Sequence, residues 1–153
     1  GFVTINFNSN TDVIQNATDL AVATTILHES VHAFLVSWAN SNDKASAQLE
    51  YPQLFNRYQY LSKNIDQNSA QHDIIVKDFI KDIAASVEQF GKAKGYDYPT
   101  EYYKDLAWKG LDGTADFNKL DIADQNRIRD IIKAEQYGII KAGSPRKGTK
   151  LGC

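Results

Sequence analysis

The stretch that decides the fold, residues 20–38, reads LAVATTILHESVHAFLVSW. Its apolar residues recur with three- and four-residue spacing, which predicts a helix with a buried stripe. Asn16 or Thr18 can cap the start of this helix, and the polar loop composition of residues 40–43 predicts its end. In its middle, residues 28–32 read HESVH, the pattern H-E-x-x-H.

The two histidines of this pattern suit a metal site. His28 and His32 lie one turn apart on one face of a helix, so both imidazoles can bind one ion. Glu29 lies beside that face, where its carboxylate can accept a proton from a metal-activated water. The alternative is an amphipathic helix that carries its histidines on a polar edge. Because these groups are costly to bury in so apolar a helix unless a ligand satisfies them, the pattern predicts a zinc site with Glu29 as general base.

His72 is the only other histidine in the chain, and it opens a second stretch of helical periodicity. This second helix is expected to begin near Ser69 and to end at Gly91 or Gly95. His72 lies on the apolar face that should pack against the first helix, so it is the predicted third metal ligand. Asp73 is the alternative. Because the two side chains would point about 100° apart on a helix, only one of them should reach the ion.

The remaining sequence predicts a mainly α fold, with α+β as the alternative. Further helices are expected after Pro52, from Pro99, and at residues 122–137. Residues 2–7 (FVTINF) alternate in polarity and carry β-branched and aromatic residues, which predicts a short strand. The expectation is a compact helical domain over residues 1–142 with a small N-terminal β element, followed by a C-terminal tail of residues 143–153.

Composition narrows the class of protein. In 153 residues, 42% are hydrophobic and 24% are charged, which suits one soluble globular domain. The net charge of −2 offers no basic surface for nucleic acid. The apolar run that contains the motif is interrupted by His28, Glu29 and His32, so no membrane span is expected. The chain has no methionine and begins at Gly1, which favours a processed or excised piece of a larger protein.

Three stretches carry a resemblance to known proteins. Residues 24–35 (TTILHESVHAFL) resemble the active-site helix of the zincin metallopeptidases. Residues 71–73 (QHD) with Ile83-Ala84, and residues 102–111 (YYKDLAWKGL), are similar to parts of small zinc-peptidase-like domains. Such domains stand at the C-termini of large secreted or surface proteins of Bacteroidetes, some of them polymorphic-toxin-like.

The resemblance implies a zinc-dependent endopeptidase with His28 and His32 as ligands and Glu29 as general base. The long gap to the third ligand resembles the gluzincin arrangement, in which that ligand is usually a glutamate; here it would be His72. A metzincin would need glycine and histidine where this chain has Leu35 and Trp38.

The resemblance also implies a secreted or delivered effector domain that acts on a protein or peptide, with an immunity or inhibitor protein as partner if it is a toxin. A peptidase needs a donor for the oxyanion, and Tyr102 and Tyr103 are the first candidates, before Arg57, Tyr58 and Tyr60. Two other functions stay open: a zinc-stabilised binding module without catalysis, and a hydrolase of non-peptide amides or esters.

Overall fold

The computed structural model describes residue 4 and residues 15–39, 52–141, 143 and 146–151. Apart from Thr4, the strand expected at residues 2–7 lies outside this part of the chain. Within it the structure is dominated by helices, which confirms a mainly α fold. The named elements are α2 (Asp19–Ala39), α4 (Pro52–Asn64), α5 (Gln67–Ile74), the π-helix η1 (Ile75–Phe79), α6 (Ile80–Ala93), α7 (Thr100–Ala107), the 3-10 helix η2 (Phe117–Lys119) and α8 (Ile122–Tyr137).

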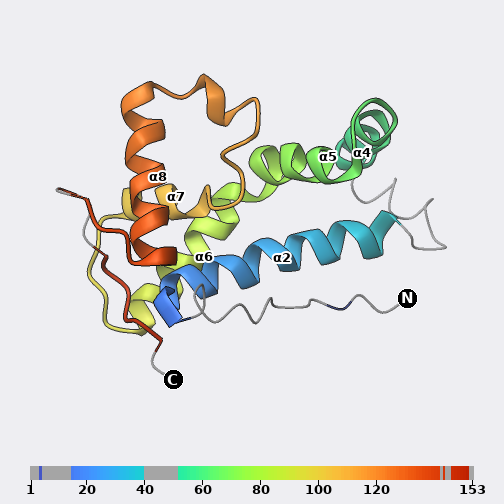
Figure 1. The fold of residues 1–153 in the computed structure, drawn as a ribbon. Coiled ribbons are helices and arrows are strands. Elements are labelled where there is room, and N and C mark those ends of the chain that lie inside the picture. Colours follow the sequence, from blue (N-terminus) through green and yellow to red (C-terminus); the bar gives the residue numbers. More distant parts are fainter. Residues whose placement is uncertain (1–3, 5–14, 40–51, 142, 144–145, 152–153) are drawn as a thin grey trace.

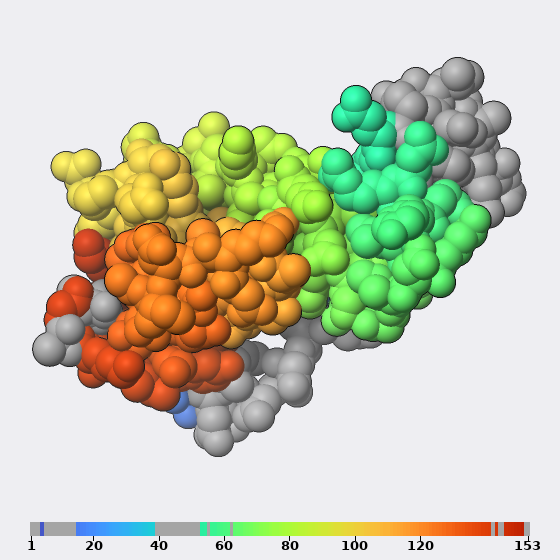
Figure 2. Space-filling model, turned by 90° about the horizontal axis from the view of Figure 1, so that it is seen from above, coloured from blue at the N-terminus to red at the C-terminus, as the bar shows by residue number. Residues whose placement is uncertain are grey.

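α2 runs along the length of the molecule, and the other helices are arranged beside it (Figure 1). α4 and α5 lie at one end of it, and α7 and α8 lie at the other. Figure 2 shows the same division from above, with α4 and α5 in green and α8 in orange beside the red C-terminal segment. The helices expected after Pro52, from Pro99 and over residues 122–137 are all present.

The first helix begins where its cap predicts. The Thr18 hydroxyl accepts a hydrogen bond from the backbone N–H of Ala21 at 3.2 Å, and α2 starts at the next residue. Leu20 and Leu35 are fully buried in the core. By length and composition alone, α2 could cross a membrane. The core helices of soluble proteins often meet the same two criteria.

The second predicted helix is not continuous. It begins two residues before Ser69, because Asp66 caps α5 by accepting the Ser69 backbone N–H at 3.0 Å. The π-helix η1 then interrupts it, and Phe79 at the junction has φ −126°. A π turn holds more residues than an α turn, so the regular 3.6-residue period is lost there and the helix bends.

α6 runs antiparallel to α2. Phe79, just before α6, packs edge-on against Phe34, with ring centroids 6.0 Å apart. Tyr96, just after α6, donates a hydrogen bond to Asp19 at the start of α2, with an O–O distance of 2.9 Å. Gly91 lies inside α6, which continues to Ala93. A Cβ at position 91 would lie 2.5 Å from the Tyr103 hydroxyl oxygen, so only glycine lets α7 pack this closely on α6.

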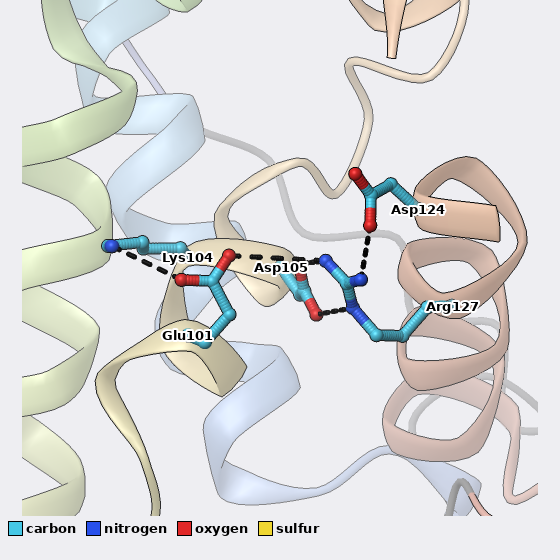
Figure 3. A network of polar contacts seen from close by, with 5 residues as sticks. All are labelled: Glu101, Lys104, Asp105, Asp124 and Arg127. Carbon is cyan, nitrogen blue, oxygen red and sulfur yellow. Dashed lines mark hydrogen bonds and ion pairs between the residues drawn. The ribbon is translucent and has the colours of Figure 1, made fainter. Parts of the chain in front are cut away.

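An ion pair between a buried carboxylate and a half-exposed guanidinium joins α7 to α8 (Figure 3). The Arg127 guanidinium reaches from α8 to the Asp105 carboxylate on α7, with N–O distances of 2.7 and 3.0 Å. Asp105 is only 3% exposed, and Asp124 binds the same guanidinium from the solvent side. Because the two planar groups are paired through two hydrogen bonds, they fix how α7 lies on α8.

Part of the expected C-terminal tail of residues 143–153 packs on the helices. Residues 147–151 lie against the fold, and Lys150 forms an antiparallel bridge with Thr18. The buried carboxylate of Glu135 on α8 accepts hydrogen bonds from the backbone N–H groups of Lys147 and Gly148. It also accepts hydrogen bonds from the hydroxyl groups of Thr18 and Tyr102. Glu135 therefore ties α2, α7, α8 and the C-terminal segment together.

Candidate metal centre

The histidines of the motif face the histidine of the second helix. His28 and His32 lie on α2 and His72 lies on α5. The ring centroids are 4.7 Å apart for His28 and His32, 5.4 Å for His28 and His72, and 5.0 Å for His32 and His72. One ring nitrogen from each residue lies within 4.8 Å of the others, which is close enough for a shared ion. We call these three residues the histidine site.

Gln71 positions the His32 ring. The His32 Nδ1 lies 2.6 Å from the Gln71 Oε1, which can only accept a hydrogen bond. The other ring nitrogen of His32, Nε2, lies 2.9 Å from the Nε2 of His28. Metal-binding histidines are commonly oriented by such a partner on the second nitrogen. Gln71 is buried and immediately precedes His72, so α5 supplies both a ligand and this positioning group.

The other two histidines are held in their neutral form. Burial, together with the nearby charges of His32, His72 and Lys109, lowers the pKa of His28 to about 3. Burial also lowers the pKa of His72, helped by His32 and opposed by Glu29. Neutral imidazole is the form that binds metal, so the site can bind an ion at neutral pH without first losing protons.

His28 is further enclosed by the turn that follows α7. Gly110 has φ 81°, and a Cβ at this position would lie 3.2 Å from the His28 Cε1. A side chain there would be strained and would crowd the imidazole. The Nδ1 of His28 is buried and has no hydrogen-bond partner among the described residues. The ring is thus positioned by packing, and its only polar contact in the described structure is with His32.

Glu29 lies beside the histidine site without belonging to it. Its charge raises the pKa of His72 and that of Lys109, which places the carboxylate near both. The group of possible ligand atoms contains the three histidines and leaves Glu29 out. Glu29 is thus a charged neighbour of the three histidines and not one of the possible ligands.

Lys109 is a site residue that the sequence did not identify. It follows α7, and its Nζ donates a hydrogen bond to the Thr25 hydroxyl at 2.6 Å. Thr25 precedes Glu29 by one helical turn, so the ammonium lies over the motif helix. Burial lowers the pKa of Lys109, while Glu29 opposes this change. The only signal in the sequence was its place in the stretch 102–111 that resembles zinc-peptidase-like domains.

The two expected oxyanion donors are both buried, and the Tyr103 hydroxyl has no hydrogen-bond partner among the described residues. The buried Tyr102 hydroxyl donates to Glu135, and the Tyr103 ring is packed against Gly91. Asp73, the alternative third ligand, is not part of the ligand group, which contains its neighbour His72. The remaining candidates lie on α4, where Arg57 pairs with Asp78, Tyr58 is buried against Trp38, and Tyr60 is exposed.

Comparisons of this chain with protein-family models, with curated proteins and with solved structures gave no match.

Proposed function

We propose that the histidine site binds one zinc ion and that the protein is a zinc-dependent hydrolase, most simply an endopeptidase, with Glu29 as general base. The observation that carries this proposal is the convergence of three imidazoles beside a carboxylate that is not itself in the ligand group. Three protein ligands with one open position are typical of catalytic zinc.

The residues fit a zinc ion in chemistry as well as in position. All three donors are imidazole nitrogens, and burial keeps those of His28 and His72 neutral. The Nε2 atoms of His28 and His32 lie 2.9 Å apart, close enough for one cation to bind both. When bound, zinc lowers the pKa of a coordinated water and polarises a carbonyl group.

The chain's own residues supply the proton transfers and the positioning. The Glu29 carboxylate accepts a proton from the attacking water and returns it to the leaving amine nitrogen. Gln71 holds the His32 ring so that Nε2 faces the site. A structural zinc site would need a fourth protein ligand, and the ligand group among the described residues has three, so we favour the hydrolase over the binding module. The secreted, toxin-like setting stays a prediction from the resemblance.

The test is Glu29→Gln. The amide cannot accept the proton, so we expect hydrolysis to fall by about 10²–10⁴-fold while zinc content and melting temperature stay close to those of the parent. Zinc-loaded parent and variant would be compared on a peptide library by mass spectrometry, with an ester panel to separate peptide from ester hydrolysis.

Glu101→Gln is the matched control, because Glu101 is exposed on α7 and pairs only with surface cations. This control should cleave at the parent rate. Equal cleavage by the Glu29→Gln variant would show that Glu29 is not the general base.

A further inference from the structure

We propose that Lys109 is an anion-binding group of the histidine site, where its ammonium holds the substrate carbonyl oxygen as that oxygen becomes negatively charged. The second half of this statement rests on the proposed function. The binding of an anion by Lys109 does not rest on it, because that binding depends only on the charge that the fold places beside the histidines.

The position of Lys109 comes from two contacts with α2. Its Nζ donates to the Thr25 hydroxyl at 2.6 Å. On a helix, Thr25 is a surface neighbour of residues three and four positions on, which are His28 and Glu29. The next residue, Gly110, packs against the His28 ring. Lys109 is therefore held from both sides, with its ammonium within one helical turn of the first ligand and of the proposed base.

The charge of Lys109 has no close counterion in the described part of the chain. An ammonium has three N–H donors, and the Thr25 hydroxyl is its one hydrogen-bond acceptor there. No carboxylate oxygen of the described residues is paired with it within 4.0 Å, whereas the half-exposed Arg127 has three carboxylate partners. A partly buried cation with free donors attracts an anion more strongly than an exposed lysine does, because its field is less screened.

The reaction needs such a charge. When the water oxygen bonds to the carbonyl carbon, the electron pair of the C=O π bond moves to the carbonyl oxygen, and Glu29 takes the water's proton. When that electron pair re-forms the C=O bond, the C–N bond breaks and the proton passes from Glu29 to nitrogen. A preorganised positive group stabilises the negative oxygen between these steps. Tyr102 donates to Glu135, while Lys109 lies beside the base and first ligand.

The test begins without zinc and without a substrate. Metal-free protein would be titrated with acetate at pH 7.5 and constant ionic strength, and the backbone amide NMR signals of Thr25, Lys109 and Gly110 followed. We expect saturable shifts in the parent and in Lys109→Arg, and at least ten-fold weaker binding in Lys109→Met. Lys133→Met, which removes an exposed lysine of α8, is the matched control and should bind as the parent does.

The inference is overturned if acetate leaves these amides of the parent unmoved, or if Lys109→Met binds acetate as well as the parent. The parent titration decides the matter even if the methionine variant fails to fold. With zinc and a cleaved peptide, Lys109→Met should lower kcat by about 10²–10³-fold with little change in KM. If anion binding depends on Lys109 but kcat does not, the ammonium binds anions without acting on the carbonyl oxygen, and the catalytic half is wrong.

Discussion

We expect Glu135→Gln to unfold roughly 6–12 °C below the parent protein, a loss of about 3 kcal/mol. Glu135 is fully buried, and its carboxylate accepts hydrogen bonds from two hydroxyls and two backbone N–H groups. A glutamine of the same size replaces one acceptor oxygen with an NH₂ group that faces these donors. Buried donors are then left without acceptors, which costs more than the net value of the bonds themselves.

Thermal denaturation followed by circular dichroism measures this effect. The exposed Glu101 again offers the matched control, and Glu101→Gln should change stability by less than about 0.5 kcal/mol. Hydrogen exchange adds a local readout, because the amides of Lys147, Gly148 and Thr149 should exchange faster in the Glu135→Gln variant. Equal melting temperatures for the two variants would mean that the carboxylate does not hold the C-terminal segment.

We also expect the metal-free protein to lose stability steeply as the pH falls below about 6.5. His28 has a pKa of about 3 in the folded protein, against 6.5 for an unperturbed histidine, chiefly because it is buried. Between these values the unfolded chain binds a proton that the folded chain does not, so the free energy of unfolding falls with decreasing pH. The slope is about 1.4 kcal/mol per pH unit, and the full loss by pH 3 is about 5 kcal/mol from His28 alone.

The lowered pKa of His72 acts in the same direction. Urea denaturation between pH 7 and 5, in the presence of a chelator, would measure the slope before most carboxylates begin to titrate. The His28→Gln variant has no group that can be protonated at this position. Below pH 6.5 the slope of its free energy of unfolding against pH should therefore be smaller than that of the parent by about 1.4 kcal/mol per pH unit. Identical slopes for parent and variant would show that His28 is readily protonated in the fold.

The helices were predictable where local sequence signals agreed with one another. α2 begins after the Thr18 cap, and α8 spans residues 122–137 as its apolar spacing and the following Gly138 predict. Gly138 has φ 69°, the left-handed conformation that ends a helix most readily with glycine. The π-helix could not be read in this way, because an apolar stripe does not reveal a turn that holds one extra residue.

The sequence was enough to predict the three histidines of the candidate site. It was not enough to predict the residues that pack around them. His28 and His32 follow from helical spacing, and His72 from being the only histidine left, and the structure brings all three together. Lys109 and the contact of Gly110 with His28 depend on how α7 packs on α2, which no local pattern specifies. The same holds for Glu135, whose four hydrogen-bond donors come from residues 18, 102, 147 and 148.

We propose above that His28, His32 and His72 together hold a catalytic zinc ion. X-ray absorption at the zinc edge, on protein loaded with one equivalent of zinc, tests it most directly. We predict three imidazole nitrogens at roughly 2.0–2.1 Å and one further light ligand at the open position, and the loss of one imidazole in His72→Ala. A spectrum with only two imidazoles, or one that His72→Ala leaves unchanged, would contradict the account.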